Sequence, residues 1–168
     1  MSRLTHFLGE ILPLVYAVSH VMSRPLITVD VESYAHDAMK LMAEKDIGAV
    51  GVTEKGEPVG IVTERDVLKK CCLGASCMKV KVREIMSRPL VTTDAETPIS
   101  EAMKVMIDKN IRRLPVTEKG EIVGIVTQED LMRGTLTVLS TLTGTLTQGL
   151  LLATLKRREL GKEVTNQA

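Results

Sequence analysis

Two short motifs combine a hydroxyl with a carboxylate at a spacing that suits ligand binding. Thr63 and Asp66 follow an apolar run typical of a strand, and Thr127 and Asp130 follow a second such run. A threonine with an acidic residue three positions later is also a capping box, which begins a helix. We therefore expect each motif at the first turn of a helix, where a hydroxyl and a carboxylate side by side can also bind the hydroxyl groups of a ligand. Capping alone needs no ligand, so both interpretations stand.

Residues suited to catalysis are few. His6, His20 and His36 are scattered along the chain, and none lies beside a plausible nucleophile. A general base has to lie within hydrogen-bond reach of the proton that it removes. We therefore expect no enzymatic active site.

The cysteines indicate neither a disulfide framework nor a complete metal site. Cys71, Cys72 and Cys77 are odd in number and lie close together, so they cannot connect distant segments. A reducing, cytoplasmic compartment fits this pattern best. Cys72 and Cys77 have a spacing compatible with half of a zinc site, but the sequence offers no second ligand pair. We expect free thiols and no metal; a zinc ion shared by two chains is the alternative.

The composition fits a soluble globular protein and argues against nucleic-acid binding. The chain of 168 residues is 44% hydrophobic and 26% charged, with a net charge of +1. Nearly balanced charges do not provide the concentrated positive field that neutralises the phosphates of a nucleic acid. With no Trp, one Phe and two Tyr, the chain also lacks aromatic platforms for stacking bases.

One unit is present twice. Residues 22–68 and 86–132 align without a gap at an offset of 64 positions, and 26 of the 47 pairs are identical. A solenoid needs three or more repeats. Two copies instead favour a pair of similar units that are related by a pseudo-twofold axis and share one core.

Each unit shows the same order of hydrophobic patterns. Residues 26–29 and 90–93 are typical of a first strand. A helical spacing follows, and Thr97–Pro98 adds a start signal with proline at the first helical position. Two apolar runs around a glycine-containing loop then predict a hairpin, and the capping motif begins a last helix. The helical spacing is that of Ala35, Ala38, Met39 and Met42, repeated by Ile99, Ala102, Met103 and Met106. The fold class is therefore α+β, with two tandem β-α-β-β-α units.

Flanking segments divide the chain into four parts. We expect an N-terminal helical arm at residues 1–16, a first unit at 17–80, a second unit at 81–133, and a C-terminal helix with a basic tail at 134–168. The arm has apolar residues at alternating steps of four and three, which is heptad spacing. Such an apolar stripe needs a partner surface to pack against.

The C-terminal segment has two interpretations. Residues 134–155 carry no charge, and a segment of this length could span a bilayer. Seven threonines, Ser140 and Gln148 dilute the apolar character, and the leucines follow a helical spacing. We expect an amphipathic packing helix. The alternative is a membrane-associated regulatory subunit of a transporter or channel, anchored by this helix.

The order and duplication of these motifs resemble a pair of CBS domains, also called a Bateman module. The resemblance rests on the repeated Met-Ser-Arg-Pro-Leu and the later Gly-Ile-Val-Thr-x-x-Asp, and it covers residues 17–133. It implies regulatory binding of an adenosine-containing ligand, such as AMP, ADP, ATP or S-adenosylmethionine, in the cleft between the units. It also implies a homodimer of modules and an effector protein that responds to the ligand-dependent conformational change. No further cofactor is implied.

The resemblance assigns roles to individual residues. The acids of the two motifs, Asp66 and Asp130, are implied to bind ribose, with Thr63 and Thr127 beside them. Contacts with the adenine or the sugar are implied for Thr28 and Thr92. Gly60 and Gly124 have no side chain, so they permit a ligand to approach the backbone closely. Because aromatic residues are scarce, the aliphatic candidates for holding adenine are Ile27, Val91, Ile61 and Ile125.

Phosphate contacts are implied for one unit more than for the other. Arg112 and Arg113 precede Leu-Pro115-Val in the second unit, where the family places basic residues that reach toward phosphate. Guanidinium groups suit this role because they are planar, multidentate donors with a permanent charge. The first unit has Gly48–Val52 at this place, so we expect asymmetric phosphate binding. Arg65 is a further candidate, with an exposed helix arginine as the alternative.

Overall fold

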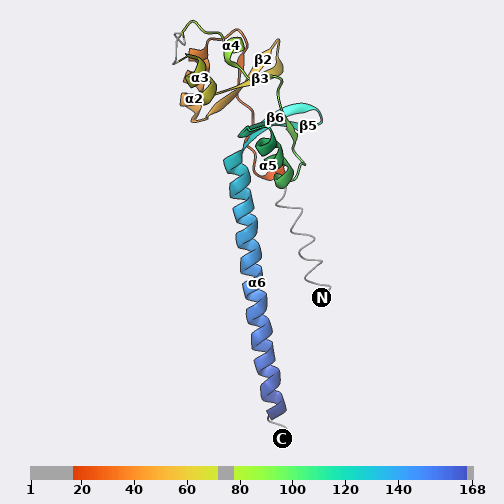
Figure 1. Ribbon diagram of the computed structural model, residues 1–168. Coiled ribbons are helices and arrows are strands. Elements are labelled where there is room, and N and C mark those ends of the chain that lie inside the picture. The colour runs from red at the N-terminus through yellow and green to blue at the C-terminus, as the bar shows by residue number, and fades with distance from the viewer. Residues whose placement is uncertain (1–16, 72–77, 166–168) are drawn as a thin grey trace.

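The computed structural model describes residues 17–71 and 78–165, which form two lobes and a long projecting helix (Figure 1). A short 3-10 helix, η2 (Val18–His20), precedes the first strand of the first unit. A one-turn helix, α4 (Val82–Ile85), precedes the first strand of the second unit. The first unit consists of β1 (Thr28–Asp30), α2 (Ala35–Lys45), β2 (Ala49–Glu54), β3 (Glu57–Thr63) and α3 (Glu64–Cys71). The second consists of β4 (Thr93–Asp94), α5 (Ile99–Asp108), β5 (Arg113–Glu118), β6 (Glu121–Thr127) and α6 (Gln128–Thr165). The predicted α+β class and the β-α-β-β-α order are confirmed.

Each unit has a three-stranded sheet in which the first pair is parallel and the second antiparallel. The strand orders are β1-β2-β3 and β4-β5-β6. The hairpins turn at Lys55–Gly56, with φ of 53° and 89°, and at Lys119–Gly120, with φ of 52° and 87°. Two central residues with positive φ match the twist of the flanking strands, and glycine adopts this conformation without strain. The predicted hairpins are therefore confirmed.

Some predicted boundaries are wrong by one to three residues. The first strand begins at Thr28, because its parallel pairing with β2 begins at Gly51, against which Leu26 packs its side chain. The corresponding strand of the second unit has only Thr93–Asp94. α5 begins at Ile99, and Pro98 is its N-cap rather than its first residue, because the proline backbone is extended at φ −56° and ψ 141°.

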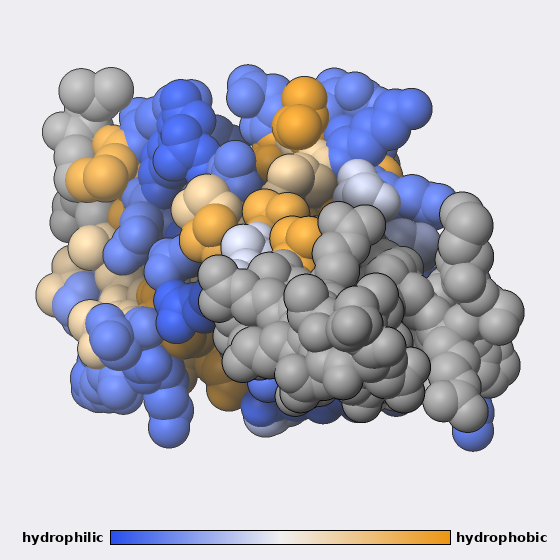
Figure 2. Space-filling model, turned by 90° about the horizontal axis from the view of Figure 1, so that it is seen from below, coloured by the Kyte–Doolittle hydropathy of each residue, from blue (hydrophilic) through white to orange (hydrophobic). Residues whose placement is uncertain are grey.

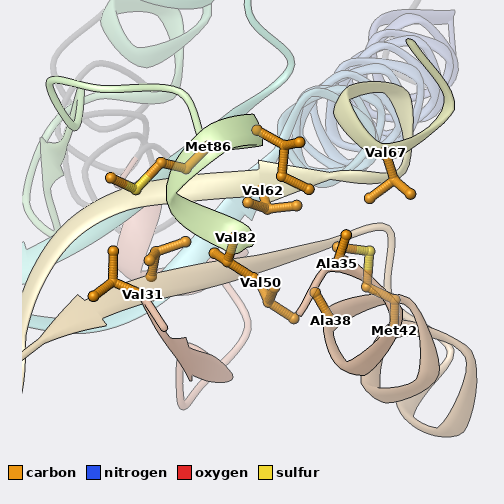
Figure 3. Packing of buried hydrophobic residues seen from close by; sticks show 11 residues of the cluster. Val31, Ala35, Ala38, Met42, Val50, Val62, Val67, Val82 and Met86 are labelled. Carbon is orange, nitrogen blue, oxygen red and sulfur yellow. The ribbon is translucent and has the colours of Figure 1, made fainter. Parts of the chain in front are cut away.

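The segment that precedes each unit completes the core of the other one. Val18 is fully buried in the second core, among residues of α5, β5 and β6. In the repeated position Val82, with Ile85 and Met86, packs in the first core against α2, β2 and β3 (Figure 3). The backbone bonds are repeated as well: Val18 N–H donates to Thr97 O over 2.9 Å, and Val82 N–H to Ser33 O over 2.8 Å. Each unit therefore depends on a segment of the other for its packing.

Two glycines leave room for these crossing segments. Ser23 exchanges two backbone hydrogen bonds with Ile125, of 2.9 and 3.0 Å, and Ser87 exchanges two with Ile61, of 2.9 and 3.2 Å. A β-carbon placed on the neighbouring Gly124 would lie 2.4 Å from Ser23 O, and one on Gly60 would lie 2.9 Å from Ser87 O. No side chain fits at that distance from a backbone oxygen.

α6 continues without a break from the second unit into the predicted C-terminal helix. Its first turns are held by Leu131, Gly134 and Val138, which are buried. A β-carbon on Gly134 would lie 2.7 Å from Val21 Cγ1, so the helix packs closely there. Each residue whose burial is described between positions 139 and 152 is exposed. No helix in the described part of the chain is long and apolar enough to cross a membrane. The predicted arm at 1–16 lies outside the described residues.

The crossing predicts that Gly124→Ala destabilises the protein. The added methyl group meets the Ser23 carbonyl, so the crossing segment has to shift, and overpacking of this kind costs about 1–3 kcal/mol. Thermal unfolding followed by circular dichroism should show a lower midpoint than that of the parent chain.

Gly144→Ala is the matched control. A β-carbon on Gly144 has no neighbour within 4 Å, and alanine is favoured over glycine inside a helix by roughly 0.5–1 kcal/mol. This variant should melt at or above the parent midpoint. Equal midpoints for Gly124→Ala and the parent would contradict the close crossing.

Candidate functional site

Both Thr-x-x-Asp motifs form the predicted capping box. The Thr63 N–H and hydroxyl donate to Asp66 Oδ2 over 3.0 and 2.7 Å, and the Asp66 N–H donates to Thr63 Oγ1 over 3.3 Å. For Thr127 and Asp130 the same three distances are 2.9, 2.7 and 3.1 Å. These bonds satisfy backbone donors that have no partner within the helix. The capping prediction is confirmed in both units.

The cap uses only one oxygen of each carboxylate. Both bonds that Asp66 accepts from Thr63 end on Oδ2, and the same holds for Asp130 and Thr127. Both aspartates are half-buried. An ionised carboxylate has about four lone-pair sites for hydrogen-bond donors. Each aspartate can therefore hold the helix start through Oδ2 while Oδ1 accepts from a ligand hydroxyl.

In the second unit, the two predicted phosphate-binding arginines lie beside the cap. Arg113 at the start of β5 pairs directly with Thr127 at the end of β6. The Arg112 carbonyl accepts from the Gln128 N–H over 2.9 Å. Directly opposite residues of an antiparallel pair have β-carbons about 5 Å apart on the same face. The structure thus brings Arg113 together with the Thr127–Asp130 cap, and Arg112 is exposed next to it.

The first unit has no arginine of its own at this place, but Arg113 reaches it. Ala49 occupies the repeated position and pairs with Thr63. A β-carbon placed on Gly48 would lie 2.3 Å from Arg113 Nη2 and 3.0 Å from Glu64 Oε2. The guanidinium therefore lies against Gly48, beside the first residue of α3. The missing side chain at position 48 makes room for this contact between the units.

The residues predicted to contact the adenine or the sugar lie in rows across the two sheets. Thr28 pairs with Gly51, which pairs with Ile61. Ile61 and Thr63 are two positions apart on one strand, so their side chains share a face. The second unit repeats the row, because Pro115 pairs with Ile125 and Thr92 precedes Thr93, the partner of Val116. Thr28 and Thr92 are exposed, whereas Pro115 is buried.

The remaining predicted residues have other surroundings. The close approach that the sequence indicates at Gly60 and Gly124 is made by the crossing segments of the chain itself. Arg65 is exposed on α3. Its counterpart Glu129 accepts a hydrogen bond of 2.8 Å from Arg133 on the next helical turn. The described part of the chain has no group of three or more His, Cys, Asp or Glu that could hold a metal, and Cys72 and Cys77 lie outside it.

A surface hollow that no motif indicated lies at the turn end of the first hairpin. Its volume is about 910 Å³, and Glu54 and Arg88 both line it. At the repeated positions Arg24 and Glu118 form an ion pair, in which Arg24 Nη1 donates to Glu118 Oε2 over 3.2 Å. This hydrogen bond lowers the pKa of Glu118 and raises that of Arg24. The remaining lining residues are Val31, Pro58, Val59, Arg83, Glu84, Met86, Pro89 and Leu90. They come from separate segments, so sequence spacing carries no signal for the hollow.

Comparison with known proteins identifies the family. A family model described as "CBS domain" matches residues 18–72 and again 82–136. An uncharacterised protein of Methanopyrus kandleri is 41% identical over 120 residues, which cover 70% of this chain and 61% of the relative. Another relative, from Methanocaldococcus jannaschii, is 34% identical over 130 residues and matches over only 31% of its own length. The chain therefore spans about three fifths or less of these relatives.

Solved structures agree with this assignment. A CBS-domain protein from Burkholderia ambifaria is 35% identical, with a TM-score of 0.66, over 68% of this chain and 85% of that one. The CBS domain pair of protein MJ0100, solved in complex with 5'-methylthioadenosine and S-adenosyl-L-methionine, is 29% identical, with a TM-score of 0.63, over 70% of this chain and 93% of that one. With two matches to the family model, the same repeated fold and the same tandem arrangement, the chain belongs to the CBS-domain family and contains a pair of CBS domains.

Proposed function

We propose that the protein is a regulatory module that binds an adenosine-type ligand at the border between its two units. The observation that carries this proposal is the twice-formed Thr–Asp cap, which leaves Oδ1 of Asp66 and of Asp130 outside the capping bonds. A ribose presents two adjacent hydroxyl donors, which suit a carboxylate acceptor. Its neighbour MJ0100 was solved with two adenosine-containing molecules, which supports the same ligand class here.

The residues around each cap contact different parts of the ligand. Asp66 with Thr63, and Asp130 with Thr127, hold the ribose. Thr28 and Thr92 contact the adenine or sugar from the neighbouring strand. The adenine lies between aliphatic side chains, for which the candidates are Ile27, Ile61, Val91 and Ile125. All four are partly buried, which leaves part of each side chain accessible.

Arg112 and Arg113 bind the phosphates of the ligand. Arg112 is exposed, and Arg113 is half-buried with its guanidinium against Gly48 of the first unit. A guanidinium between the two units can bind a phosphate held by either cap. AMP, ADP and ATP are therefore candidate ligands beside S-adenosylmethionine, and Arg65 adds a second charge near the first cap.

Regulation follows from the position of the ligand. A ligand that contacts both units changes the equilibrium between conformations by its difference in affinity for them. The caps begin α3 and α6, so such a change reaches helices on the surface of each unit. An effector protein binds one of the two conformations. The chain itself acts in the cytoplasm as a homodimer and has no active site of its own.

A panel of ligands tests the ligand class directly. A ligand present at one hundred times its dissociation constant stabilises the folded state by about 2.7 kcal/mol. AMP, ADP, ATP or S-adenosylmethionine should therefore raise the melting midpoint of the full chain, and reduced nicotinamide dinucleotide is a further adenosine-containing test ligand. If none of these compounds shifts the midpoint at millimolar concentration, the proposed ligand class is wrong.

Substitution of the acids separates ribose binding from capping. Asp66→Asn keeps an oxygen that can accept from Thr63 but places an amide donor where a ribose hydroxyl has to be accepted. This variant and Asp130→Asn should each lose binding at one site, as measured by calorimetry, with melting midpoints close to the parent. Asp66→Ala and Asp130→Ala lose the capping hydrogen bonds as well, so their melting midpoints should fall below those of the Asn variants. Full binding by both Asn variants and by their combination would leave the acids as helix caps only.

Substitution of the arginines tests phosphate binding. The Arg112→Ala and Arg113→Ala double variant loses charge-assisted hydrogen bonds, which are about twice as strong as neutral ones. Its affinity for AMP should fall at least tenfold, and its affinity for adenosine should change little. Lys109→Ala, which removes an exposed charge at the end of α5, is the control. Equal losses for adenosine and AMP would mean that the arginines act through packing.

A further inference from the structure

The exposed part of α6 carries a hydrophobic stripe. Met132, Leu136 and Leu139 are 54%, 61% and 54% exposed. They follow steps of four and three, whereas Leu131 and Val138 face the module and are buried. The helix projects from the second lobe (Figure 1). Seen from below, the molecule shows separate hydrophobic patches among hydrophilic residues (Figure 2). The stripe therefore begins at the module and runs outward along the helix.

The spacing of the stripe is that of a coiled coil. The alternating steps continue along α6 through Met132, Leu136, Leu139, Thr143, Leu146, Leu150 and Ala153. A straight helix has 3.6 residues per turn, so a strict repeat of 3.5 stays on one side only if two helices supercoil around each other. Five of these seven positions are Leu or Met, one is Ala and one is the polar Thr143, which is typical of the apolar seam of a coiled coil.

This part of α6 is poorly suited to exist alone. Residues 134–155 contain seven threonines and three glycines, which are weak helix formers. Helices in water draw most of their stability from the packing of an apolar face. Beyond Val138 the module supplies no such packing, because each residue with described burial from 139 to 152 is exposed.

We propose that α6 pairs with α6 of a second copy of this chain along this seam. Residues 134–155 carry no charge, so two copies meet without repulsion, and a charged partner finds no counter-charge. The positions that flank the seam, such as Ser140 and Thr147, are also neutral. They therefore offer no charges that would favour a helix of different sequence as the partner. A twofold contact covers the same stripe on both copies at once.

A distance measurement between two copies tests the pairing. Gln148→Cys carries a spin label on an exposed position away from the seam, in a full chain in which Cys71, Cys72 and Cys77 are replaced by serine. Paired helix axes lie about 8–10 Å apart, so pulsed dipolar spectroscopy should give an intermolecular distance below about 40 Å in either helix orientation. Dimerisation through the modules alone would not require this short distance.

Two exposed leucines provide the matched variants. Leu139→Asn lies in the seam and should abolish the short distance, whereas Leu152→Asn, 63% exposed on another side of α6, should retain it. Leu136→Asn provides a second seam variant, and an unchanged melting midpoint of the modules shows that each variant folds. A monomeric parent chain, or a short distance that survives both seam substitutions, would overturn the proposal. A short distance that forms only with phospholipid vesicles would assign the stripe to a membrane surface instead.

Discussion

The exchange of the two segments that precede the repeats is the constraint on which the rest of the structure depends. Val18 fills the core of the second unit, and Val82, Ile85 and Met86 fill that of the first. Each segment is fixed by paired backbone hydrogen bonds beside a glycine, at Ser23–Ile125 and at Ser87–Ile61. Buried backbone groups have to find partners, so a unit without its crossing segment would leave strand edges and core positions uncovered. The two units consequently form one cooperative module.

The crossing also determines where the candidate site can form. After Ser23 the chain passes directly to Leu26, which covers Gly51, and then enters β1. Because the exchange holds the units against each other, the start of β5 comes close enough to the first unit for Arg113 to lie against Gly48. Each cap is local and needs only residues three apart, but the surface between the caps exists only in the assembled pair. The position of Arg113 beside the first unit therefore depends on how the two units pack against each other.

This difference between local and non-local interactions explains what the sequence could predict. The helix at Ala35–Lys45, the Lys-Gly turns and both capping boxes depend on residues close in sequence, and their patterns are unambiguous. The first strands were misplaced because their ends depend on pairing with β2 and β5, which periodicity does not show. The exchange itself has no local signal, since the buried core neighbours of Val18, from Ala95 to Leu131, lie 77 to 113 positions away from it. Arg113 is a candidate because of the resemblance to the family segment, but its contact with Gly48 required the structure.

Duplication with local divergence gives this module its asymmetry. The two copies agree where the framework is made, at the capping threonines and aspartates and at the glycines beside the crossing segments. They differ at the border between the units, where Gly48–Ala49 correspond to Arg112–Arg113, and in the last helix, because α6 runs to Thr165. A substitution at an exposed position such as Arg112 changes the surface charge without disturbing either of the two cores. The paired fold therefore keeps two similar Thr–Asp caps in place, while Arg113 between the units and the long α6 make the two halves physically different.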